Sequence, residues 1–167
     1  MNTVLWRHIT RRQGLQYLAC CTSAGLINAG TVQAAETSLP VTTSLADSLQ
    51  QALQRKQPLV VMVSLQGCPF CKVVRENYLM PLQREGLPVV QLNMRSAQAI
   101  TDIDGSAQSQ EGLIRKWGIQ LAPTVLFLGP QGKEVAPRLK GAYLADFYGA
   151  YLDEQLTLAR QAIAAVR

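Results

Sequence analysis

The chain has 167 residues, a formal net charge of +5 at pH 7 and a single histidine. That histidine and three of the 16 Lys and Arg residues lie within residues 1–34, so residues 35–167 carry 13 Lys and Arg against 11 Asp and Glu. The remaining net charge of +2, without a dense basic run, argues against nucleic-acid binding. A part without histidine has no Cys-His or Ser-His nucleophile and no imidazole ligand for zinc, so we expect no metal site.

Residues 1–34 have the layout of a cleavable export signal peptide. A positively charged start is followed by a weakly apolar stretch of 13 residues, 15–27, and by the small-residue sequence Val32-Gln33-Ala34. A membrane-spanning helix needs about 20 mostly apolar residues. We therefore expect cleavage before Ala35, with residues 35–167 forming one domain; an uncleaved membrane anchor is the alternative.

The segment from Thr10 to Gln16 contains Arg11 and Arg12 and resembles a twin-arginine export signal. An ordinary positively charged region is the alternative. Both routes end in the bacterial periplasm, where a redox-active cysteine pair usually has dedicated electron partners.

A surface helix and a buried strand open the predicted domain. Ser44 is a suitable helix N-cap, and apolar residues recur at helical spacing after it until Pro58 ends the pattern. Residues 59–65 then form a continuous apolar run, which is typical of a strand buried on both faces.

A Cys-x-x-Cys motif follows this strand. Cys68 and Cys71 are the only cysteines beyond residue 34, because Cys20 and Cys21 lie in the predicted signal. One helical turn brings two such sulfurs within bonding distance, so the pair can cycle between dithiol and disulfide. We therefore expect a thiol-disulfide oxidoreductase whose redox group is the Cys68–Cys71 pair, without a bound cofactor.

Helical and strand patterns alternate after the motif. A helix that starts at Cys68 is expected to kink at Pro81 and to end at Gly86, and a strand is expected over 88–94. Residues 95–109 show no readable pattern, and a short helix is expected over 111–117.

Two further strands and a long helix complete the prediction. The strands cover 124–128 and 133–140 and are joined by a turn, and the second is edge-like because it contains Pro137. A last helix runs over about 143–164. It is predicted to bury Leu144, Phe147, Tyr148, Tyr151, Leu152, Leu156 and Ala159.

This order of elements, together with three motifs, resembles single-domain periplasmic thioredoxin-like proteins, the group that includes the thioredoxins of sulfur oxidation and cytochrome maturation. The motifs are Gly67-Cys68-Pro69-Phe70-Cys71-Lys72, Ala122-Pro123-Thr124 and Gly132-Lys133-Glu134-Val135 followed by Gly141. The resemblance covers most of residues 44–160. It implies an α/β thioredoxin fold with a central mixed sheet of about four strands flanked by helices.

The resemblance also implies a cis peptide bond before Pro123, facing the two cysteines. An X-Pro bond costs only about 0.5–1 kcal/mol in the cis form. Ala122 would then pair its backbone with an extended substrate segment, so Ala122, Pro123 and Thr124 are the predicted substrate-binding residues. An ordinary proline at the start of a strand is the alternative.

Thiolate chemistry assigns different roles to the two cysteines. Cys68 precedes a helix N-terminus, which lowers a thiol pKa, so it is the predicted attacking nucleophile, and Cys71 is the predicted resolving cysteine. Pro69 suits the first helical turn, where its missing N–H costs nothing. Phe70 either gives this corner an apolar docking surface or packs inside the protein. Lys72 adds a positive charge or is a solvated side chain.

Two residues depart from the cytosolic thioredoxin pattern. Met62 stands where those proteins keep a buried aspartate that helps to deprotonate the second cysteine, and Gly67 stands where they keep a tryptophan. Glu76, Glu85 or water would have to move the proton instead. Trp117 is interpreted as a core residue.

The predicted function is the reduction of disulfides in specific periplasmic proteins by a monomer, which receives electrons from a membrane or periplasmic donor. Disulfide oxidation or isomerisation, and client binding without turnover, are the alternatives. Related motifs span potentials from about −270 to −120 mV, so the two residues between the cysteines do not define the direction of electron flow.

Overall fold

The computed structural model describes residues 38–142 and 147–166. The predicted export signal, its cleavage site and Leu144 lie outside the described residues. The predictions about them therefore stay predictions.

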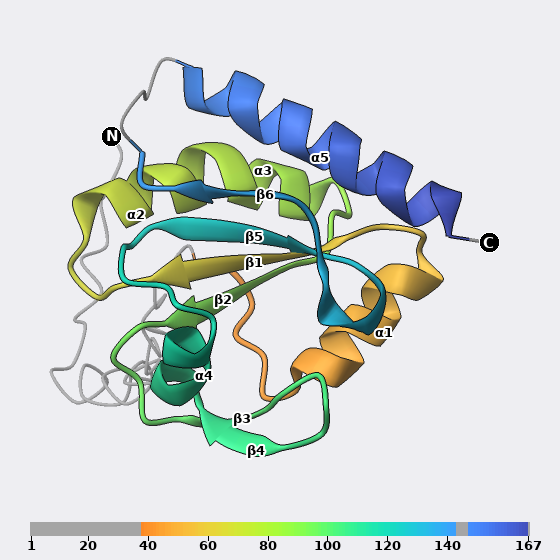
Figure 1. Cartoon of the computed structure of the whole chain (residues 1–167). Helices are drawn as coiled ribbons and strands as arrows, with labels where there is room; N and C mark the ends of the chain where they lie inside the picture. Colours follow the sequence, from red (N-terminus) through yellow and green to blue (C-terminus); the bar gives the residue numbers. More distant parts are fainter. Residues whose placement is uncertain (1–37, 143–146, 167) are drawn as a thin grey trace, which may run out of the picture. The chain divides into compact units, whose positions relative to one another are not determined.

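A four-stranded mixed sheet forms the centre, with the strand order β2-β1-β5-β6 (Figure 1). The strands are β1 (Leu59–Ser64), β2 (Val89–Asn93), β5 (Thr124–Leu128) and β6 (Glu134–Lys140). Strand β1 runs parallel to β2 and antiparallel to β5, and β6 is antiparallel to β5. All six residues of β1 are buried, as its unbroken apolar run predicted. The predicted α/β fold with a mixed sheet is therefore confirmed.

Helices cover both faces of the sheet. They are α1 (Leu45–Gln54), α2 (Pro69–Val73), α3 (Met80–Arg84), α4 (Gln110–Lys116) and α5 (Tyr148–Ala165). Alternate residues of β1 enter two separate apolar clusters: Met62 packs with α2 and α5, and Val61 packs with α1 and α4. Figure 1 shows α5 on the same face as α2 and α3, with α1 and α4 toward the opposite face.

The helix that follows Cys68 contains a π-helical turn, Val74–Leu79, between α2 and α3. The wider turn comes directly before Pro81, which has no N–H for the helical ladder. The departure from α-helical hydrogen bonding therefore begins before the predicted kink. The run ends as predicted at Gly86, whose φ of +98° is an angle that glycine adopts without strain.

Residues 95–109 form a second, two-stranded sheet. Its strands are β3 (Ala99–Thr101) and β4 (Ala107–Ser109). Asp102 in the connecting turn is 4% exposed and accepts hydrogen bonds from the Lys116 ammonium at 2.8 Å and the Gln108 amide at 3.0 Å. Strands of three residues are too short for a periodic pattern, which explains why the sequence did not reveal them.

Helix α5 corrects part of the predicted core. Phe147 is 61% exposed and Tyr151 is 47% exposed, although both were predicted to be buried. The other described residues of that prediction, Tyr148, Leu152, Leu156 and Ala159, are buried, and Gln155 and Ile163 are buried on the same helix. Phe147 and Tyr151 are four residues apart and lie away from the buried face of α5, which a count of apolar residues alone did not distinguish.

The remaining elements agree closely with the predictions. Strand β5 has the predicted limits, β6 contains Pro137 at the edge of the sheet, and the turn between them is a 3-10 turn, Pro130–Gly132. Trp117 is half-buried against the α1 and α4 side of the core.

Candidate active site

Strand directions bring the two sequence motifs to one end of the sheet. Strand β1 ends at Ser64, which is paired with Asn93 at the end of the parallel strand β2. The antiparallel strand β5 begins at Thr124, which is paired with Val63. The loop after β1 and the loop before β5 therefore meet, although their residues Cys68 and Ala122 are 54 positions apart.

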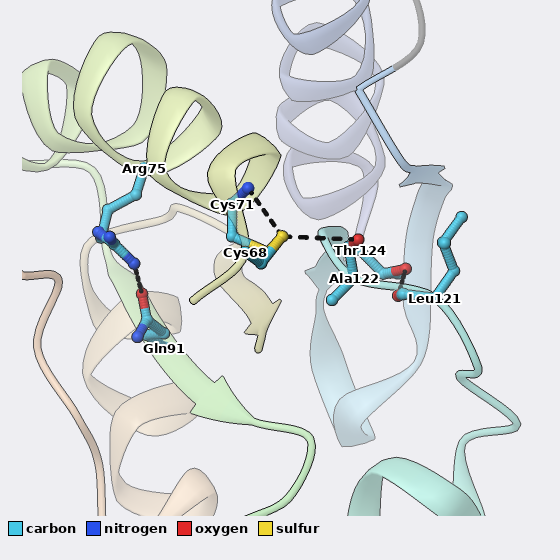
Figure 2. The surroundings of a disulfide bond; sticks show 7 residues. All are labelled: Cys68, Cys71, Arg75, Gln91, Leu121, Ala122 and Thr124. Carbon is cyan, nitrogen blue, oxygen red and sulfur yellow. Dashed lines mark hydrogen bonds between the residues drawn. A yellow bond between two sulfur atoms is a disulfide. The ribbon is translucent and has the colours of Figure 1, made fainter. Parts of the chain in front are cut away.

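Cys68 and Cys71 are joined by a disulfide, with their Cα atoms 5.2 Å apart (Figure 2). Cys68 is the N-cap of α2 and is half-buried, whereas Cys71 is 1% exposed. Pro69 occupies the first turn of α2, as predicted. An incoming thiol or disulfide can therefore reach the sulfur of Cys68 but not the buried sulfur of Cys71, which can react only with Cys68.

The backbone around Cys68 is arranged to stabilise a thiolate. The N–H of Cys71 points at the sulfur of Cys68, with the nitrogen 3.1 Å from Sγ. At a helix N-terminus such a donor favours the negatively charged form of a thiol. The same N–H is therefore placed to donate to a Cys68 thiolate in the reduced protein.

The peptide bond between Ala122 and Pro123 is cis, which is the isomer that the resemblance implied. The Ala122 carbonyl oxygen lies 3.9 Å from Cys68 Sγ. Two hydrogen bonds hold the loop: Gly141 N–H donates to the Pro123 carbonyl at 2.7 Å, and the Thr124 hydroxyl donates to the Leu121 carbonyl at 2.7 Å. Among the described residues the Ala122 N–H donates no backbone hydrogen bond, so the backbone at Ala122 is free to pair with an added strand.

The residues beneath Cys71 are apolar. Met62 is 0% exposed and belongs to the same core cluster as Cys71, so no carboxylate stands at that position. Of the two glutamates considered as proton carriers, Glu85 is exposed at the end of α3, and Glu76 lines a cleft next to Cys68.

That cleft has a volume of about 600 Å³, and its surface is polar and apolar in nearly equal parts. This cleft was not predicted from the sequence. Arg75 belongs to the helical run after Cys68, whereas Gln91 and Asn93 belong to β2, and only the fold brings these segments together. Only the spacing of Lys72 and Arg75, three residues apart on one helix, could have indicated a shared face. The cleft is lined by Ser38, Ser64, Leu65, Gln66, Gly67, Cys68, Pro69, Lys72, Arg75, Glu76, Gln91 and Asn93.

Phe70 lies on the surface next to the disulfide and is 61% exposed. The structure therefore agrees with the first of its two interpretations, an apolar surface at this corner. Val73 in the same helix and Leu121 beside the cis bond are 37% and 39% exposed.

Within residues 38–142 and 147–166, no group of three or more His, Cys, Asp or Glu side chains is placed to hold a metal ion. No helix in those residues combines the length and the apolar character that a membrane crossing requires.

The family model for a thioredoxin-like domain matches residues 45–156. The match covers two thirds of the chain and includes both motifs of the site, so the chain belongs to the thioredoxin-like domain family. The resemblance and the fold predicted from the sequence are thereby confirmed. No curated protein matches the chain.

Solved structures of thioredoxin-fold proteins are similar to this chain at low identity. A thioredoxin-fold protein from Helicobacter pylori is 17% identical over 65% of this chain and 83% of that chain, with a TM-score of 0.45. Thioredoxin from Fasciola hepatica is 24% identical over 71% of this chain and 97% of its own, with a TM-score of 0.45. The periplasmic thioredoxin SoxS from Paracoccus pantotrophus, in its reduced form, is 19% identical over 62% of this chain and 99% of its own, with a TM-score of 0.41.

Proposed function

We propose that this thiol-disulfide oxidoreductase is an exported protein that reduces disulfides in particular periplasmic proteins. The observation that carries the proposal is the asymmetry of the pair: an accessible Cys68 sulfur at a helix N-terminus is bonded to a Cys71 sulfur that is 1% exposed, beside the open backbone of Ala122.

The reaction has two exchange steps. In the reduced protein the Cys68 thiolate attacks one sulfur of the substrate disulfide, forming a mixed disulfide and releasing the other substrate sulfur as a thiolate. The Cys71 thiolate then attacks Cys68 Sγ and releases the second substrate thiolate. The substrate gains two electrons and takes up two protons, and the protein is left with the Cys68–Cys71 disulfide.

Substrate binding would use the loop beside the pair. An extended substrate segment can pair with the Ala122 backbone as an added strand, which places a cysteine of that segment next to Cys68 Sγ, 3.9 Å from the Ala122 carbonyl. Phe70 would contribute apolar contact, since most of its ring is free to be covered.

The proposed location rests on the sequence before residue 35, and the proposed electron donor rests on that location. Its export-signal pattern supports a periplasmic protein, either released after cleavage or held by an uncleaved anchor. A protein that reduces disulfides in an oxidising compartment must itself be reduced again, so we include a membrane or periplasmic dithiol donor in the proposal. The proposal treats the protein as a monomer.

Trapping of mixed disulfides tests the proposal. A Cys71→Ala variant expressed in its own periplasm should accumulate disulfide-linked client proteins at Cys68, and a Cys68→Ser variant should capture none. Wild-type protein should reduce insulin in the presence of dithiothreitol, and Cys68→Ser should not. Failure of Cys71→Ala to capture any client would contradict the substrate-directed reductase.

Two further measurements separate the alternatives. A redox titration of the Cys68–Cys71 pair measures its reduction potential, which sets the direction of electron flow between the pair and its clients. A difference of 30 mV corresponds to about 1.4 kcal/mol for a two-electron couple. A potential near that of strong oxidants would favour disulfide formation in clients. Unchanged client binding and activity in Cys68→Ser would favour a binding module without turnover. An N-terminus at Ala35 in the periplasmic fraction would support cleavage.

A further inference from the structure

The cleft beside Cys68 extends beyond the disulfide. Its far wall is formed by Gln91 and Asn93 of β2, and a second hollow of about 590 Å³ shares these two residues with it and continues to Arg95. Together they form one groove, the β2-side groove, which begins at Cys68. The two hollows also share Leu65 and Gln66.

The groove contains positive charges that have no ion-pair partner in the part of the chain that the structure describes. Within the described residues, neither Lys72 nor Arg75 has a carboxylate oxygen within ion-pair distance. Three other cations, Arg115, Lys116 and Arg138, each form an ion pair with a carboxylate. Lys72 and Arg75 therefore leave two positive charges without an ion-pair partner in the cleft that contains Cys68.

Arg75 is held in place with donors to spare. Its Nη1 donates to the Gln91 amide oxygen at 3.3 Å, and its Nε is buried without a hydrogen-bond partner among the described residues, so a ligand would bind through the remaining N–H groups of Nη1 and Nη2. A guanidinium has five N–H donors and binds a carboxylate through two parallel hydrogen bonds. Among the described residues, Glu76 is the only acidic side chain that lines the groove, against Lys72, Arg75 and Arg95, so the described lining carries a net positive charge.

The groove and the cis-proline loop lie on opposite sides of the disulfide. Figure 2 shows Arg75 and Gln91 on one side of Cys68 and Ala122 and Thr124 on the other. The strand order gives the reason, because β2 and β5 flank β1 on its two edges. A substrate segment whose cysteine reaches Cys68 from the Ala122 side therefore has neighbouring side chains within reach of the groove, since consecutive Cα atoms are about 3.8 Å apart.

We propose that the β2-side groove binds a carboxylate of the substrate polypeptide, supplied by an Asp or Glu one or two residues from the reactive cysteine. The inference rests on the proposed function and narrows its substrates to acidic disulfide-bearing segments. Lys72 and Arg75 provide the charge, and Gln91 fixes the guanidinium. A carboxylate bound in the groove holds the substrate disulfide next to Cys68. Disulfide exchange is therefore faster with acidic segments than with neutral ones.

Single-turnover kinetics on matched peptides test the inference. Each peptide carries one cysteine as a mixed disulfide with neutral 2-thiopyridine, and either Glu or Gln stands one or two positions before or after that cysteine. The reduced protein converts each peptide disulfide to peptide thiol and pyridine-2-thione while it forms the Cys68–Cys71 disulfide. We expect the best-placed Glu peptide to react about tenfold faster than its Gln counterpart, as one charge-assisted contact allows.

Variants identify the groups responsible. Lys72→Gln and Arg75→Gln should bring the Glu-to-Gln rate ratio toward one, and Arg84→Gln, an exposed cation on the same helical run outside the groove, should leave the ratio unchanged. Added NaCl should also reduce the ratio in the wild type. Because Arg75 is half-buried, Lys72→Gln keeps the test valid if Arg75→Gln does not fold.

Equal rates for Glu and Gln peptides at every position would overturn the groove assignment and leave the proposed function standing. An acid preference that persists in both Lys72→Gln and Arg75→Gln would overturn it as well. If the reduced wild type reacts with none of the peptides, the proposed function fails and the inference fails with it.

Discussion

Tyr148 allows a direct test of the packing behind the cysteine helix. Its side chain is 5% exposed and belongs to the core cluster that contains Cys71, and its ring packs on Tyr78 with ring centroids 5.0 Å apart. Its hydroxyl has no hydrogen-bond partner among the described residues. A Tyr148→Phe substitution removes the unpaired hydroxyl and keeps the ring.

The expected change is a gain in stability. A buried polar group without a partner costs about 1–3 kcal/mol, so the free energy of unfolding should rise by about that amount at pH 7. With a typical urea m-value, this corresponds to a rise of roughly 1 M in the denaturation midpoint.

The pH dependence supplies a second readout with a defined sign. Burial, followed by the charge of Tyr78, raises the pKa of Tyr148 above its ordinary value of 10.0. Above pH 10 the unfolded chain has lost this proton and the folded protein retains it, so wild-type stability falls with a slope that approaches about 1.4 kcal/mol per pH unit. Tyr148→Phe lacks this loss, so the gap between variant and wild type should widen above pH 10.

Urea denaturation followed by circular dichroism, at pH 7 and between pH 9.5 and 11, measures both effects. Tyr151→Phe is the matched control, because Tyr151 lies on the same helix and is 47% exposed. The control should change stability by less than about 0.5 kcal/mol. A Tyr148→Phe variant that is less stable than wild type at pH 7, or a constant gap above pH 10, would refute the reasoning.

Two further predictions concern surface residues. Hydrogen bonds from the hydroxyl and N–H of Ser106, with a smaller contribution from Lys116, lower the pKa of Asp104 to about 2. The stabilising effect of the Asp104 carboxylate should therefore be present above pH 4 and lost as the pH falls toward 2. The difference in Tm between wild type and Asp104→Asn should shrink over that interval. A difference that does not change with pH would contradict this. For Phe70→Ser we expect an unchanged Tm and a fall of about 5- to 30-fold in kcat/KM for protein disulfides, because roughly 1–2 kcal/mol of apolar burial is lost on binding. An equal fall with a small-molecule disulfide would show that Phe70 acts on the cysteines rather than on the substrate.

The features predicted correctly are those encoded by neighbouring residues. The buried run of β1 and the five apolar residues of β5 each show their burial within one short segment. The hairpin of β3 and β4 escaped prediction because its strands have three residues each, and the hydrogen bond that joins Asp102 in its turn to Lys116 spans 14 positions of the sequence. Likewise the aromatic side chains of Phe147 and Tyr151 resemble that of buried Tyr148, and only the packing of α5 on the sheet decides which of them are buried.

By itself the sequence determined the chemistry, because two cysteines one helical turn apart can form a disulfide wherever a strand-to-helix turn places them. Only the tertiary structure decided which sulfur is accessible, which loop faces it and which charges remain unpaired. Those properties depend on the pairing of β1 with β2 and β5, which brings Ala122 and Arg75 to opposite sides of Cys68. Contacts between distant segments are set by the packing of the whole sheet, and no local pattern contains them.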